Sequence, residues 1–378
     1  MVVSQSEIVS SPTRLERRQE LALQLSRIWA WVFLALLIIF FFFSVSLTSD
    51  GRVNFLTLRN SQNILVAITP VLLMGLGQTF VIISAGIDLS VGWVMGLASV
   101  VSALVIRSLV DDVGMAQELA IAIGFAAGVS SALIPGFING VIIAKLHVPS
   151  FIVTLGMSFI ARGAAFLLSG GNVVGGQPQG VRNFGNEALL YYVSGEGGGL
   201  YFLKRPDVTG EQLRHLDRIF TWPVVVTAIA VTIAIFILRR TQFGRHTYAI
   251  GGNREAAVRA GVPVDRHTIL IYMLASFTAG IAGVLHTARF SGGSSIAGDP
   301  LLLSSIAAVV IGGVSLFGGA GHITGTIIGA LIIAVLTTGL VMLNVQPFWQ
   351  FVVVGIVVIL AVLIDQSRDL IIGRAERM

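Results

Sequence analysis

Residues 60–106, NSQNILVAITPVLLMGLGQTFVIISAGIDLSVGWVMGLASVVSALVI, contain one charged side chain, Asp88. The uncharged runs on either side of Asp88 match the length of about 20 residues that a helix needs to cross a bilayer. Because unpaired backbone groups are costly in lipid, only helices and closed barrels span membranes, and barrel strands alternate apolar with polar residues. The stretch therefore predicts two membrane-spanning helices joined beside an aspartate.

The composition of the whole chain supports this prediction. Of its 378 residues, 55% are hydrophobic and 11% are charged, whereas a soluble domain carries about 25% charged residues. The other uncharged runs bring the expected total to about ten spans, near residues 28–48, 62–84, 90–107, 118–143, 150–168, 219–238, 268–288, 302–317, 322–343 and 347–364. We therefore predict an all-α polytopic membrane protein.

Basic residues predict the orientation of these spans. With ten spans both termini lie on one side, and the loops of that side carry fourteen arginines and lysines against nine in the opposite loops. The positive-inside rule places the richer side in the cytoplasm. Residues 1–27 are expected to form a cytoplasmic amphipathic segment with a Thr13–Glu16 capping box, residues 28–365 the transmembrane domain, and residues 366–378 a cytoplasmic tail.

Several functional classes find no support in the sequence. The chain contains no cysteine, and its six histidines show no metal-ligand spacing with carboxylates, so we expect neither a metal site nor a catalytic site. Its net charge of +5 reflects a basic membrane face, and no folded basic domain for nucleic acid is visible. Neither of its two lysines, Lys145 and Lys204, follows a glycine, which excludes a P-loop for ATP.

Glycine is abundant, with 43 residues, and many glycines are spaced by four, as in Gly136/Gly140 and Gly325/Gly329. Small residues at this spacing let helices pack closely in a membrane. The denser cluster GGVSLFGGAG, residues 312–321, predicts an irregular break at the end of the eighth span. Broken segments of this kind often line a cavity in transporters.

The expected cytoplasmic loop, residues 239–267, contains signals for one short helix. Asn253 can cap its start, Glu255 suits its first turn, and Gly261 followed by Pro263 ends it. The small apolar face of this helix has no partner within the loop. The residues leave three alternatives open: the helix packs on its own bundle, lies at lipid headgroups, or docks into another protein.

Motifs in this loop and in several spans resemble those of a known family. Glu255, Ala256, Ala257 and Gly261 match the EAA-x-x-x-G pattern of permease subunits of bacterial ATP-binding-cassette (ABC) importers. GIDLSVG, GRHTYAIGGNREAAVRAGV and VVIGGVSLFGGAGHITGTIIGA resemble blocks of the ribose, xylose and galactose permeases, within the branched-chain amino-acid/ribose permease superfamily, over roughly residues 55–365. The resemblance implies a bacterial inner-membrane permease that works as a pair, as a homodimer or with a close relative.

The same resemblance implies partners: a cytoplasmic ATPase that holds the ATP and Mg²⁺, and an extracytoplasmic sugar-binding protein. The coupling residues that it implies are Arg245, Asn253, Glu255, Ala256, Ala257 and Gly261, which would dock the short helix into the ATPase. The chain itself is then no enzyme and carries no cofactor. The alternative is an ion-coupled secondary transporter of a small polar solute, although such proteins usually bury more ionisable residues at mid-membrane.

Polar residues within apolar spans are candidates for the sugar pathway, because a sugar calls for amide, hydroxyl and aromatic partners rather than charges. The candidates for this pathway or its gate are Gln78, Asp88, Ser90, Asn139, Phe151 and Thr154. For Asp88 the competing interpretation is a cap on a helix beginning at Leu89. For Asn139 and Thr154 it is an ordinary bridge between helices.

The predicted external loop, residues 169–218, is Gly-rich at first and then polar and charged. Its two interpretations are a surface that receives the sugar-binding protein and a solvated linker. Taken together, the sequence predicts the permease subunit of a monosaccharide importer that works by alternating access.

Overall fold

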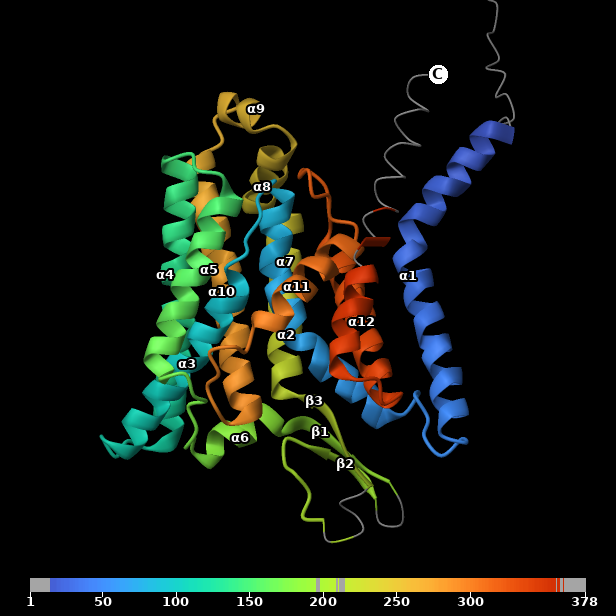
Figure 1. Cartoon of the computed structure of the whole chain (residues 1–378), viewed down its shortest axis with the longest axis vertical. Helices are drawn as coiled ribbons and strands as arrows, with labels where there is room; N and C mark the ends of the chain where they lie inside the picture. The colour runs from blue at the N-terminus through green and yellow to red at the C-terminus, as the bar shows by residue number, and fades with distance from the viewer. Residues whose placement is uncertain are drawn as a thin grey trace, which may run out of the picture.

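The computed structural model describes residues 14–194, 198–208, 210, 215–357, 359–360 and 363, with side chains from residue 29 onward. It is a helical bundle with a small sheet at one end (Figure 1). The helices are α1 (Arg14–Thr48), α2 (Leu58–Ile83), α3 (Val91–Asp111), α4 (Gln117–Lys145), α5 (Ser150–Ser169), α6 (Gln179–Asn186), α7 (Trp222–Arg240), α8 (Gln242–Gly252), α9 (Arg254–Arg259), α10 (Val264–Phe290), α11 (Asp299–Ile311) and α12 (Ile323–Met342).

Eight helices of the described part are long and apolar enough to cross a membrane: α2, α3, α4, α5, α7, α10, α12 and the segment Trp29–Thr48 of α1. These eight correspond to eight of the ten expected spans, so the prediction of an all-α polytopic membrane protein is confirmed. The expected spans 302–317 and 347–364 correspond to shorter apolar helices, α11 and Pro347–Val357. With 13 residues, α11 rises about 20 Å, less than the roughly 30 Å of hydrocarbon.

The described part of the N-terminal segment is helical. Residues 1–13, and with them the Thr13 half of the expected capping box, lie outside the described residues, as does the tail 366–378. From Arg14 one continuous helix runs through the first span to Thr48, so the described part of the segment is not separated from that span. An uninterrupted helix satisfies its own backbone groups, which is favourable wherever the chain enters lipid.

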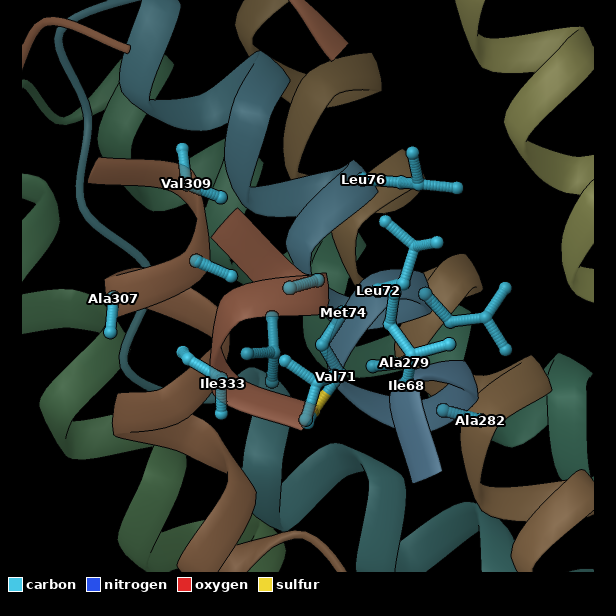
Figure 2. Close-up of a cluster of buried hydrophobic side chains, with 14 of the residues drawn as sticks. Ile68, Val71, Leu72, Met74, Leu76, Ala279, Ala282, Ala307, Val309 and Ile333 are labelled. Atoms are coloured by element: carbon cyan, nitrogen blue, oxygen red, sulfur yellow. The ribbon is translucent and has the colours of Figure 1, made fainter. Parts of the chain in front are cut away.

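Helix α2 is the centre of the bundle. Every residue from Val71 to Ile83 is buried, and α10, α11 and α12 pack around it. Figure 2 shows part of this core, where Ile68, Val71, Leu72, Met74 and Leu76 meet side chains of the three surrounding helices. In contrast, α5 exposes large apolar side chains such as Phe159 and Ile160, as expected for a helix facing lipid or another apolar surface.

The spaced glycines lie where helices approach most closely. A Cβ placed on Gly140 of α4 would lie 2.6 Å from the Cα of Ile269 in α10, and one on Gly136 would lie 2.7 Å from the Cβ of Ser276. Gly325 and Gly329 of α12 lie even closer to backbone carbonyl oxygens, those of Gly312 just after α11 and of Ala308 within α11. The interpretation of these glycines as packing residues is therefore confirmed.

The expected external loop contains structure that the sequence did not reveal. Helix α6 is followed by a three-stranded antiparallel sheet of β1 (Ala188–Val193), β2 (Gly199–Phe202) and β3 (Leu216–Thr221), in the order β2-β1-β3. Because β3 extends to Thr221, helix α7 begins at Trp222, three residues after the expected start of the sixth span at 219.

The two ends of the bundle are different. The start of α1 lies at the same end as α8 and α9, whereas α6 and the sheet lie at the opposite end (Figure 1). The expected cytoplasmic and external loops are therefore on opposite sides, as the sequence predicted. Which of these sides faces the cytoplasm rests on the distribution of basic residues.

Candidate functional site: a broken helix junction and the hairpin that touches it

Residues 84–90 connect α2 to α3 without helical structure, although both flanking helices are buried in the bundle. Side chains of other helices bind the backbone of this junction. The amide of Ile87 donates to the hydroxyl oxygen of Ser150 over 3.1 Å, and the amide of Leu89 donates to that of Thr154, also over 3.1 Å. The Gln78 amide group donates to the Asp88 carbonyl oxygen. These side chains satisfy backbone groups that have no partner within a helix.

The Asp88 carboxylate organises the start of α3. Its Oδ1 atom accepts the backbone amide of Ser90 at 2.8 Å and the Ser90 hydroxyl at 2.6 Å. The Ser90 hydroxyl oxygen in turn accepts a hydrogen bond of 3.0 Å from Asn139 Nδ2 on α4. Helix α3 begins at Val91, two residues later than expected, yet Asp88 still places its negative charge at the positive end of the helix dipole.

Three oxygen atoms of this network accept no hydrogen bond from the described residues. They are Gln78 Oε1, Asp88 Oδ2 and Asn139 Oδ1, and all three are buried. Buried polar atoms are paired in the great majority of cases, so an incomplete buried network is unusual. These oxygens can therefore accept hydroxyl groups if the junction opens.

The structure brings together five of the six pathway candidates. Gln78, Asp88, Ser90, Asn139 and Thr154 all contact the junction or one another, and each is completely buried. Phe151 lies apart from them, with half of its side chain exposed on α5. Ser150 was not among the predicted residues, because a serine at the start of a helix looks like an ordinary helix-starting residue.

The loop between α7 and α10 contains two helices, α8 and α9, where the sequence analysis expected one. Asn253 caps α9 as expected, since its Oδ1 atom accepts the amide of Ala256 at 2.9 Å. Gly261 has a φ of +78° and follows the end of the helix. Ala257 is buried against Ile250 and Val264, and this contact holds α9 on α8 and on the start of α10.

Most of α9 remains exposed at the end of the bundle. Asn253, Glu255, Ala256 and Val258 are exposed, and so is Arg245 on α8. Glu255 and Arg259 form an exposed ion pair of 3.6 Å within the helix. Ala257 and an ion pair of 3.8 Å between Arg254 and Asp265 of α10 attach one side of α9 to the bundle. Its free face is available to a partner or to lipid headgroups.

Helix α8 connects this exposed face to the junction. Tyr248 donates its hydroxyl to the carbonyl oxygen of Gly321 over 2.6 Å, and burial raises the pKa of this phenol, which keeps it a donor. Gly251 lies directly against the carbonyl group of Ile83, the last residue of α2, and leaves no room for a Cβ. The Gly319 amide donates to the same Ile83 oxygen over 2.8 Å.

The Gly-rich segment, residues 312–321, also takes part in the contact between α8 and the end of α2. Helix α11 ends at Ile311 and α12 begins at Ile323, so the expected irregular break is confirmed and starts earlier than residue 317. Gly318, Gly319 and Gly321 have φ values of +87°, +72° and +147°, which residues with side chains rarely adopt. The segment therefore folds tightly enough to place its backbone against both α8 and the end of α2.

The described residues contain no group of three or more histidine or acidic side chains that could hold a metal ion. The site is thus a set of hydrogen bonds and close backbone contacts. It runs from an exposed helix pair, through α2 and the Gly-rich segment, to a buried polar junction.

Comparisons with known proteins agree with the motif analysis. Residues 60–362 match the family described as branched-chain amino acid transport system / permease component. The chain is 37% identical to the fructose import permease protein FrcC of Rhizobium meliloti, over 78% of this chain and 74% of the relative. It is 38% identical to the ribose import permease protein RbsC of Bacillus subtilis, over 84% and 87%.

A third relative, the xylose transport system permease protein XylH of Haemophilus influenzae, is 36% identical over 85% of this chain and 92% of its own length. No solved structure matches the chain. The resemblance to sugar-importer permeases that the motifs indicated is confirmed, and with it a multi-pass protein of the inner membrane. The chain therefore belongs to the family of branched-chain amino acid transport system permease components.

Proposed function

We propose that this chain is the membrane-spanning permease of an ABC importer that takes up a monosaccharide, a pentose or a hexose. The relatives named above are import permeases for fructose, ribose and xylose, and all three solutes are neutral sugars. The polar residues at the junction carry amide and hydroxyl groups, which suit a substrate rich in hydroxyls. A second permease copy, an ATPase with ATP and Mg²⁺, and an extracytoplasmic sugar-binding protein complete the transporter.

The observation that carries this proposal is the contact of α8 with Ile83 and the Gly-rich segment. In the proposed mechanism, ATP closes two ATPase domains beneath the membrane and displaces the docked α9 helices. Helix α8 passes this displacement to the end of α2 and to residues 312–321. The junction at Asp88 then rearranges, and the central path opens toward the outside to accept sugar from the binding protein.

The coupling role is tested by Glu255→Arg and Gly261→Val in the assembled transporter. Both residues lie at the proposed ATPase contact, so we expect sugar uptake to fall at least about ten-fold while ATP hydrolysis continues and membrane insertion stays normal. Glu118→Arg is the matched control, because Glu118 is an exposed acidic residue in the first turn of α4 at the other end of the bundle. Uptake by both coupling variants at the level of the control would refute the role of α9.

A further inference from the structure

A polar cavity of about 570 Å³ lies at the end of the bundle where the sheet is found. Its walls come from α6, β1, β3 and the last turn of α10. Four arginines line it, Arg182, Arg205, Arg218 and Arg289. The one acidic residue among the described lining is Glu187, so the cavity is strongly positive.

Ion pairs within the described part of the chain do not neutralise this charge, since none of them includes any of these four arginines. Arg218 Nη1 donates to the carbonyl oxygen of Asn186 over 3.0 Å, and the Arg289 guanidinium lies 5.7 Å from the centre of the Phe290 ring. Both contacts hold the side chains without cancelling their charge. Several guanidinium groups around one hollow repel one another, and an anionic occupant relieves this repulsion.

The cavity is firmly attached to the spans. Asn186 Nδ2 donates to the carbonyl oxygen of Arg289 over 3.0 Å, and Gly185 packs against the carbonyl of Ala288 with no space for a Cβ. The Trp222 amide, at the start of α7, donates to the carbonyl oxygen of Glu187 over 3.2 Å. An occupant of the cavity therefore contacts the end of α10 directly and lies against Glu187, whose carbonyl oxygen is bonded to the start of α7.

We propose that this cavity receives carboxylate side chains of the sugar-binding protein during docking, an assignment that rests on the proposed function. Guanidinium groups bind carboxylates through paired N–H donors, and complementary charge speeds encounter and fixes orientation. Arg182, Arg205 and Arg218 are exposed, so a protein surface can reach them. A hollow of 570 Å³ holds more than one acidic side chain, which suits a loop better than a single small anion.

The test measures the affinity of the permease, assembled with its ATPase in nanodiscs, for its cognate sugar-binding protein. Arg182→Glu and Arg205→Glu each place a carboxylate in the cavity. Lys204→Glu is the matched control, because Lys204 adjoins Arg205, is exposed and does not line the cavity. We expect each arginine variant to weaken binding at least about ten-fold, the control to weaken it less than about two-fold, and Arg182→Lys to retain most of the affinity.

Two further measurements complete the test: the salt dependence of the affinity, and the binding of citrate as a free anion. Wild-type affinity is expected to fall between about 50 and 500 mM NaCl, and the arginine variants to lose most of this dependence. The assignment of the cavity would be overturned if Lys204→Glu weakened the affinity for the sugar-binding protein as much as the arginine variants do. It would also be overturned if citrate bound to the permease through Arg182 while the affinity for the sugar-binding protein did not depend on Arg182. If the wild-type transporter binds no sugar-binding protein at all, the proposed importer function fails together with the cavity assignment.

Discussion

Tyr248 and Gly321 are 73 positions apart in the chain, and the hydroxyl of Tyr248 donates to the carbonyl oxygen of Gly321 over 2.6 Å. Tyr248 belongs to the hairpin formed by helices α8 and α9, and Gly321 belongs to the Gly-rich segment before α12. The hydrogen bond therefore joins the surface that we assign to ATPase docking with a segment that also contacts the end of α2. Helix α8 also contacts α2 through Gly251 against Ile83 and through the ring of Phe243 against that of Phe80.

Replacing Tyr248 with phenylalanine removes this hydrogen bond and keeps the ring. A net hydrogen bond is worth about 0.5–1.5 kcal/mol, so we expect the thermal stability of the protein to change little. Sugar uptake per ATP hydrolysed is expected to fall about three-fold or more, because α8 loses its hydrogen bond to the Gly-rich segment. Measuring uptake and hydrolysis in the same proteoliposomes checks this, and an unchanged ratio would show that the bond carries no movement.

Gly251 of α8 contacts Ile83 at the end of α2, and a substitution at Gly251 gives a sharper test. A Cβ at Gly251 collides with the Ile83 carbonyl group, whereas a Cβ at the neighbouring Gly252 meets nothing within 4 Å. We expect Gly251→Ala to displace α8 from α2 and to reduce ATP-driven uptake at least about ten-fold. Gly252→Ala should stay within about two-fold of wild type. Similar activities for the two variants would mean that close approach at Gly251 is not needed.

Asp88 is predicted to matter for stability through its hydrogen bonds. Asp88→Ala leaves the buried amide and hydroxyl of Ser90 without their acceptor, which costs about 1–3 kcal/mol for an unsatisfied group. Asp88→Asn retains an acceptor oxygen and should be less destabilising. Thermal unfolding of the purified permease, followed by tryptophan fluorescence, compares the two variants. An alanine variant as stable as the asparagine variant would contradict the assigned role.

Gly140 is predicted to determine the packing of α4 on α10. A Cβ at this position would lie 2.6 Å from the Cα of Ile269, so Gly140→Ala forces two helices apart and should destabilise the protein by about 1–3 kcal/mol. In α5, a Cβ on Gly156 meets nothing within 4 Å, and Gly156→Ala is the matched control. The melting temperature in detergent reports both changes. The packing interpretation would be wrong if the two substitutions had the same effect.

Local signals account for what could be predicted about α9. The cap at Asn253, the acidic residue at Glu255 and the positive φ at Gly261 act within one or two turns of helix, so the sequence alone indicates where the helix begins and ends. Helix α8 was missed because GRHTYAIGG, with glycines at Gly244, Gly251 and Gly252, has weak helix signals. It becomes a helix where Gly244 and Gly251 pack against neighbouring backbone.

The sheet was missed for a different reason. Its strands are four to six residues long. Strands β1 and β3 are neighbours in the sheet, with Leu190 opposite Ile219, although β2 lies between them in the sequence. Pairing at such separation leaves no periodic pattern in the strands themselves. The positive cavity depends on this pairing, because it brings Arg218 beside α6.

The sequence by itself determined that this chain is a helical membrane protein, because long uncharged runs have few alternatives in water or in lipid. It also determined which residues carry the family motifs. The tertiary structure decided that Gln78, Asp88, Ser90, Asn139 and Thr154 meet at one buried junction. It also decided that Tyr248 and Gly251 join α8 to the Gly-rich segment and to the end of α2. The physical reason is that these contacts form between helices far apart in the chain, where close packing at glycine and buried hydrogen bonds select one arrangement.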